Sequence, residues 1–127
     1  MSEINNYIEA NKERFLEELK ELLRIPSVSA VSSYNDQVKE AAEMVRTKME
    51  EAGVDKAEVC PTEGHPIVYG EKLVDNNAPT VLVYGHYDVQ PPEPLELWKS
   101  DPFEPEVRDE KIFARGASDD KGQMFIH

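Results

Sequence analysis

The chain has 127 residues, a formal net charge of −12 at pH 7 and a sequence pI near 4.6. This length suits one domain, and the strong acidity argues against nucleic acid or an anionic membrane surface as a partner, because both attract basic patches. The single cysteine, Cys60, cannot form an internal disulfide, and no apolar run approaches the roughly 20 residues of a membrane span. The N-terminus lacks a signal-peptide pattern, so we expect a cytoplasmic protein with no membrane partner.

Two amphipathic helices are predicted in the first part of the chain. Apolar residues recur at helical spacing from Ile4 to Leu23, and Pro26 ends this pattern. A second helix fits residues 35–52, with Gly53 well placed to cap its C-terminus. The residues that this second helix is expected to bury are Val38, Ala41, Ala42, Val45 and Met49.

The remaining pattern predicts short strands and one late helix. Strands are expected at about 57–60 and 67–72, and a hairpin at 106–108 and 111–113. The run 81–84, Val-Leu-Val-Tyr, lies between a proline and a glycine, which favours a buried central strand. A last helix is expected to begin near Asp120.

Three side chains are candidates for chemistry: His86, Asp88 and Asp119. His86 and Asp88 follow the predicted central strand two residues apart, so an extended backbone would place both on one face. A His-x-Asp pair there suits a metal ligand with a supporting carboxylate, although Asp88 could instead cap a backbone amide. Asp119 and Asp120 are also favoured residues at a helix start. The positive charge of Lys121 is expected to offset the negative charges of Asp119 and Asp120.

Three segments occur in order: GHYDVQP at 85–91, Trp98 followed by DPF at 101–103, and RGASDDKGQ at 115–123. Together they resemble the zinc exopeptidase family of aminoacylase, succinyl-diaminopimelate desuccinylase, glutamate carboxypeptidase and the cytosolic dipeptidases, and are most similar to the dipeptidase branch. The resemblance implies an α/β fold in which residues 1–127 form the N-terminal portion of a three-layer α/β/α catalytic domain. The inserted dimerisation domain and the C-terminal part are then absent.

The resemblance also implies a role for each candidate. His86 matches a ligand to one metal, Asp119 matches the carboxylate that bridges two metals, and Asp88 matches the acid that orients His86. Two zinc ions are expected in the complete enzyme, with cobalt or manganese as alternatives. The peptide between Asp119 and Asp120 is expected to be cis. His65, which precedes a proline in a turn, is expected to be structural.

The implied reaction is hydrolysis of a dipeptide amide bond by a water that two metals activate. The alternatives are an N-acyl amino acid deacylase or desuccinylase, or an inactive truncated fragment of such an enzyme. The family's glutamate base and its further ligands fall beyond the position that matches His127. The pairs Glu17-Glu18 and Glu50-Glu51 lie on exposed helix faces and are not substitutes. We therefore expect the isolated chain to be inactive and the complete enzyme to be a homodimer acting on small peptides or N-acyl amino acids.

Overall fold

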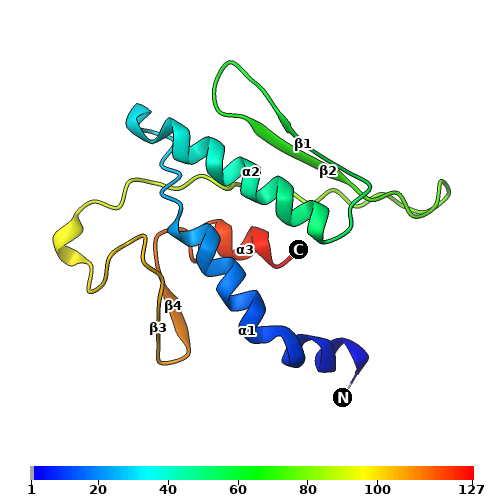
Figure 1. Cartoon of the computed structure of the whole chain (residues 1–127), viewed down its shortest axis with the longest axis horizontal. Helices are drawn as coiled ribbons and strands as arrows, with labels where there is room; N and C mark the ends of the chain where they lie inside the picture. The colour runs from blue at the N-terminus through cyan, green and yellow to red at the C-terminus, as the bar shows by residue number, and fades with distance from the viewer. Residues whose placement is uncertain (1) are drawn as a thin grey trace.

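A computed structural model describes residues 2–127 of the chain (Figure 1). Its three α-helices are α1 (Glu3–Arg24), α2 (Asn35–Glu51) and the short α3 (Lys121–Phe125). Its strands are β1 (Lys56–Cys60), β2 (Ile67–Glu71), β3 (Glu106–Arg108) and β4 (Lys111–Phe113). Two 3₁₀ turns, η1 (Ser32–Tyr34) and η2 (Leu95–Leu97), complete the regular structure of the described residues. The predicted helices, and the strands expected at 57–60, 67–72, 106–108 and 111–113, are confirmed to within about two residues.

Helix α1 has two halves with different surroundings. The Ser2 side chain caps its start by accepting a hydrogen bond from the Asn5 amide, and the chain leaves the helix just before Pro26. Leu22 and Leu23 near its end are fully buried, whereas Ile4 is 70% exposed. The N-terminal half of α1 therefore projects into solvent, as Figure 1 shows, and its C-terminal half reaches the core.

Helix α2 lies between α1 and the β1–β2 hairpin and supplies much of the core. It buries four of the five expected side chains and leaves Met49 partly exposed, while Gly53 follows its end with a φ of 83°. A positive φ at this position is the usual way for glycine to terminate a helix. The core cluster contains Leu22, Ile25, Ala41 and Val45, with Val68, Tyr87 and Met124 packed against it.

The strands form two separate antiparallel pairs. Strand β1 pairs with β2 in a register that sets Cys60 opposite Ile67, and β3 pairs with β4. The turn of the second hairpin places Asp109 and Glu110 at φ values of 50° and 61°. Two successive positive φ angles belong to the two-residue turn whose twist matches that of paired strands.

The predicted buried central strand at 81–84 is wrong for the described residues. The segment is not paired into a sheet, and Val81, Leu82 and Tyr84 are 82%, 90% and 86% exposed. A strand requires a neighbour for its backbone hydrogen bonds, and residues 2–127 place no strand beside this run. Its apolar sequence indicates a preference for burial that these residues do not satisfy.

The segment that follows is held by the loop after α1. Val28 and Val89 form an isolated parallel bridge, and the Val89 amide donates to the Ser27 carbonyl at 2.9 Å. The buried Ser27 hydroxyl donates to the Tyr87 carbonyl at 2.7 Å. These contacts fix the backbone on both sides of Asp88, so the N-terminal part of the chain positions the candidate site.

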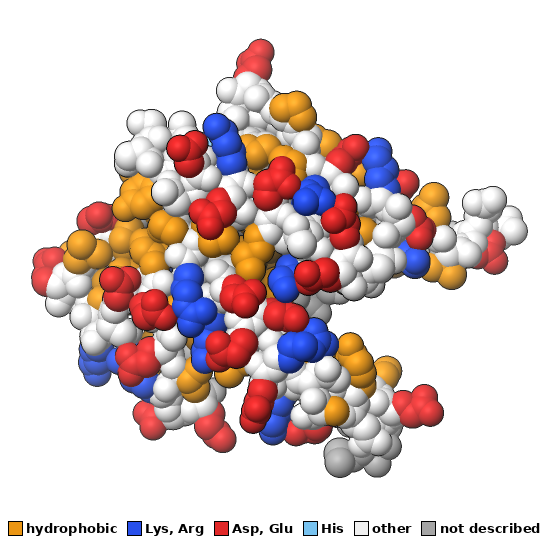
Figure 2. All heavy atoms as spheres, viewed as in Figure 1, with side chains coloured by type: hydrophobic (Ala, Val, Ile, Leu, Met, Phe, Trp, Pro, Cys, Tyr) orange, Lys and Arg blue, Asp and Glu red, His pale blue; other side chains and the backbone are white. Residues whose placement is uncertain are grey.

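The surface shown in Figure 2 carries many acidic side chains interspersed with lysine and arginine. Many ion pairs join residues three or four positions apart on one helix, such as Arg14 with Glu18 and Arg46 with Glu50. Exposed pairs of this kind contribute only a few tenths of a kcal/mol each. None of the helices in residues 2–127 combines the length and apolarity that a membrane crossing requires.

Candidate metal centre

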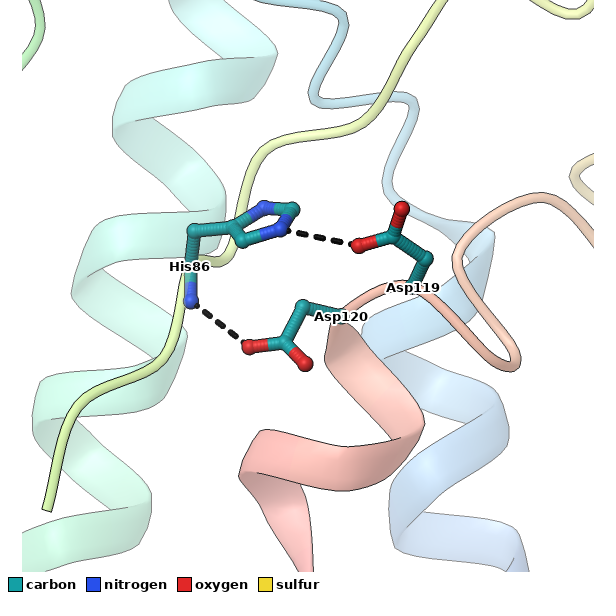
Figure 3. A group of neighbouring side chains, drawn as sticks. All are labelled: His86, Asp119 and Asp120. Carbon is teal, nitrogen blue, oxygen red and sulfur yellow. Dashed lines mark hydrogen bonds and ion pairs between the residues drawn. The ribbon is translucent and has the colours of Figure 1, made fainter.

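The structure brings His86 and Asp119 together from segments 33 residues apart (Figure 3). His86 lies on the extended segment after the exposed apolar run, and Asp119 lies in the loop that leads into α3. The His86 Nε2 atom is 3.0 Å from Asp119 Oδ1. The Asp119 side chain is 82% exposed, so the pair opens toward solvent.

The other ring nitrogen of His86 faces Asp88. Nδ1 lies 3.1 Å from both the Asp88 carbonyl oxygen and Asp88 Oδ1. A carbonyl oxygen can only accept a hydrogen bond, so we assign the hydrogen to Nδ1. In the neutral ring, Nε2 is then the nitrogen with a free lone pair, which is the atom that a metal would bind.

The charges around His86 favour a positive neighbour. Burial lowers the pKa of His86, but the Asp88 carbonyl and the Asp119 carboxylate outweigh burial and hold this pKa above its ordinary value. The same negative groups that stabilise a proton on the ring would stabilise a cation beside it.

Asp120 is a third member of the cluster, and its contact with His86 was not predicted from the sequence. Its Oδ2 atom accepts the backbone N–H of His86 at 3.0 Å, and ligand atoms of His86, Asp119 and Asp120 lie within 4.8 Å of one another. A Cβ atom on Gly85 would lie 3.0 Å from Asp120 Oδ2 and 2.8 Å from Met124. Gly85 therefore allows the two segments to approach closely. The Asp119–Asp120 peptide is cis, as expected.

Lys121 does not offset the neighbouring acids as predicted. Its side chain is fully buried, and Nζ donates to the carbonyl oxygens of Leu22 and Ile25 at 2.9 and 2.7 Å. These acceptors lie at the end of α1, where backbone carbonyls lack helical partners. Burial lowers the pKa of Lys121 to about 7. A lysine at this position thus ties the start of α3 to the end of α1.

The donor set fits a divalent cation. Two donors 3.0 Å apart can both contact one ion at about 2.0–2.2 Å, and imidazole nitrogen with carboxylate oxygen is a common zinc set. Within residues 2–127 this is the one group of three or more His, Cys, Asp or Glu side chains with such proximity. The four glutamates of the two adjacent pairs instead bond to basic residues on their own helices: Glu17 with Lys20, Glu18 with Arg14, Glu50 with Arg46, and Glu51 with Lys48.

Comparison with known proteins agrees with this geometry. Residues 82–127, which contain the whole cluster, match the model of peptidase family M20/M25/M40. The resemblance seen in the motifs is confirmed over this segment. The chain is also 37% identical over 117 residues to a cysteinylglycine-S-conjugate dipeptidase of Corynebacterium striatum, covering 92% of this chain and 26% of that enzyme.

Two further similarities extend the comparison. Over 44 residues the chain is 61% identical to a succinyl-diaminopimelate desuccinylase of Thiobacillus denitrificans, covering 35% of this chain and 11% of that enzyme. The structure of human carnosine dipeptidase 1 superposes with a TM-score of 0.85 at 26% identity, covering 94% of this chain and 28% of that one. The expected fold is therefore confirmed as an incomplete α/β peptidase domain. The chain spans about a quarter of the length of the dipeptidases that it matches.

Proposed function

We propose that this chain supplies one part of the metal centre of a dipeptidase that hydrolyses an amide bond. The observation that carries the proposal is the 3.0 Å approach of His86 Nε2 to Asp119 Oδ1, with Asp88 on the opposite ring nitrogen. Metal-dependent hydrolysis needs ligands that stay fixed while substrate and water exchange at open positions. The exposed pair of His86 and Asp119 meets this need, because Asp88 fixes the His86 ring through Nδ1 and leaves Nε2 facing solvent and Asp119.

Each of the three residues has its own task in this proposal. His86 binds a metal ion through Nε2, and Asp88 holds the ring by accepting the hydrogen of Nδ1. Asp119 has two carboxylate oxygens and an exposed side chain, which supports a bridging position between two ions. Two zinc ions in the complete enzyme would polarise the scissile carbonyl and lower the pKa of a bound water, and cobalt or manganese are alternatives.

A small dipeptide is the substrate that the comparisons favour. Similarity to the Corynebacterium dipeptidase extends over 92% of the chain, whereas the desuccinylase match covers 35%. The second candidate is hydrolysis of an N-acyl amino acid. Its support is the higher identity to the desuccinylase across the shorter segment.

Residues 1–127 are proposed to be the N-terminal portion of the catalytic domain. A general base is needed to take a proton from the attacking water, and the cluster in residues 2–127 contains no glutamate for this purpose. We therefore expect the 127-residue chain to be inactive by itself. A homodimer in the complete enzyme and a cytoplasmic location belong to the same proposal; the single free cysteine, Cys60, supports the location.

Metal titration tests the ligand assignment directly. Zinc or cobalt is titrated into the 127-residue chain, with heat or cobalt absorption as the signal. We expect His86→Ala and Asp119→Ala each to weaken binding at least about tenfold, because each removes one donor. Asp36→Ala, which removes an exposed acid from α2, is the matched control and should leave the affinity unchanged. Equal affinities in all four proteins would refute the site.

Turnover tests the reaction. The 127-residue chain is assayed with a cysteinylglycine dipeptide and with an N-succinyl amino acid in the presence of zinc, manganese or cobalt. We expect no hydrolysis, and measurable turnover would contradict the proposal that the site is partial. In the complete enzyme, Asp119→Ala should abolish activity because it removes the shared ligand. Near-normal rates in that variant would contradict the bridging role.

A further inference from the structure

Ser29 contacts the carboxylate that supports the candidate metal ligand. Its hydroxyl donates to Asp88 Oδ2 at 2.5 Å, while the other oxygen, Oδ1, faces His86 Nδ1. A hydrogen bond from a hydroxyl to a charged carboxylate is short and strong compared with one between neutral groups. Both oxygens of Asp88 are therefore engaged, one by the loop after α1 and one by His86.

Ser29 is itself held in place on both sides. The Ser29 carbonyl lies 2.9 Å from His65 Nε2, and the preceding residue, Val28, is fully buried and bridged to Val89. The donor thus belongs to a fixed backbone. His65 has a structural position here, as expected from its turn, but its contact reaches toward the candidate site.

A carboxylate that is held at one oxygen can rotate about its terminal torsion, because that torsion has a broad energy profile. The Asp88 side chain is 38% exposed, so water can compete for an oxygen that rotates away from His86. The Ser29 hydroxyl opposes this rotation by holding the distal oxygen. The hydrogen on Nδ1, and with it the free lone pair on Nε2, then keeps a single arrangement.

We propose that Ser29 is a positioning residue for the metal centre, acting through Asp88 to fix the His86 ring with Nε2 directed at Asp119. This inference rests on the proposed function, because it assigns Ser29 a task in the same site. Four contacts connect five residues in a chain: His65 to Ser29, Ser29 to Asp88, Asp88 to His86, and His86 to Asp119.

Nuclear magnetic resonance of the His86 ring nitrogens in the metal-free chain tests the inference without requiring activity. In the unaltered protein we expect a protonated Nδ1 and a single ring environment. Ser29→Ala should broaden the ring signals while the backbone amide spectrum elsewhere is retained, because Nδ1 keeps the Asp88 carbonyl but loses a fixed Oδ1. Zinc affinity should fall about tenfold, the lower end of the range for residues behind a metal ligand.

Matched variants separate the hydroxyl from the shape of the side chain. Ser29→Thr keeps the hydroxyl and should restore the ring signals and the affinity, whereas Ser29→Val has the same shape without a donor and should behave like alanine. If the Ser29→Ala variant does not fold, the comparison of Ser29→Thr with Ser29→Val tests whether the hydroxyl positions His86. Ser33→Ala, an exposed serine in η1, is the control and should change neither measurement.

The positioning role is overturned if Ser29→Ala and Ser29→Val leave the His86 signals unchanged and zinc affinity within about twofold of the unaltered chain. That result, together with weakened binding in His86→Ala, would refute the role of Ser29 alone. Unaltered zinc binding in His86→Ala would instead refute the proposed metal site. The ring measurement would still decide whether Ser29 fixes His86.

Discussion

Replacing Lys121 with methionine tests how α3 is attached to the rest of the molecule. The substitution keeps an unbranched side chain of similar length in a fully buried position and removes the two hydrogen bonds to Leu22 and Ile25. Each carbonyl retains one other donor, since the Ile25 amide contacts Leu22 O and the Ser27 amide contacts Ile25 O. Neither acceptor is left empty, so the loss is that of two ordinary bonds.

The expected magnitude follows from these contacts. A net loss of about 0.5–1.5 kcal/mol for each hydrogen bond gives roughly 2 kcal/mol for the pair. The opposing effect is relief from burying an amine, whose cost is visible in the lowered pKa of Lys121. We expect the loss of the two hydrogen bonds to outweigh the relief from burying the amine, because the Lys121 amine donates to two carbonyls at a helix end.

Urea unfolding followed by circular dichroism measures the change. A loss of roughly 2 kcal/mol should lower the urea midpoint by about 1 M, given a slope near 2 kcal/mol/M for a chain of this size. Lys99→Met, at an exposed lysine, is the control and should change stability by less than about 0.5 kcal/mol. If the Lys121→Met variant is as stable as the original protein or more stable, burying the amine destabilises the fold at least as much as its two hydrogen bonds stabilise it. That result would refute the expected net stabilisation by Lys121.

Two further substitutions test other contacts. Gly122→Ala should destabilise the chain by at least about 2 kcal/mol in the same urea assay, because the new Cβ would lie 1.9 Å from the Ala117 carbonyl oxygen. Gly64→Ala, whose Cβ would meet nothing closer than 3.9 Å, is its control, and equal effects would refute the clash. Leu82→Lys should leave stability within about 0.5 kcal/mol and reduce self-association in sedimentation experiments, because exposed apolar edges promote association. A loss above 1 kcal/mol would show that Leu82 is buried.

The parts of the fold that follow from local sequence were predicted correctly. Helical periodicity gave α1 and α2, Gly53 marked the end of α2, and Asp109-Glu110 marked the hairpin turn. The run at 81–84 was predicted as buried because its composition indicates a buried strand. Burial of a strand depends on neighbouring strands, which composition cannot supply, and the described residues leave this run exposed.

The candidate site shows the same division between local and long-range information. The His86–Asp88 spacing suggested that the two side chains interact, and they do. The approach of Asp119 was inferred from the family resemblance, since no spacing rule connects residues 33 positions apart. Ser29 and Lys121 lacked any such signal: a serine in a loop and a lysine beside two acids have many ordinary explanations, and only three-dimensional contacts distinguish among them.

The sequence separation of these contacts has a consequence for how the molecule folds. Ser29 and Asp88 are 59 residues apart, and Lys121 and Leu22 are 99 apart. Contacts between distant residues form slowly, because the intervening chain must first lose conformational freedom. On the ribosome, α1 therefore emerges long before the residues that bind its C-terminal end. The candidate metal ligands His86 and Asp119 can reach their geometry in the structure only after the loop carrying Asp119 has been synthesised.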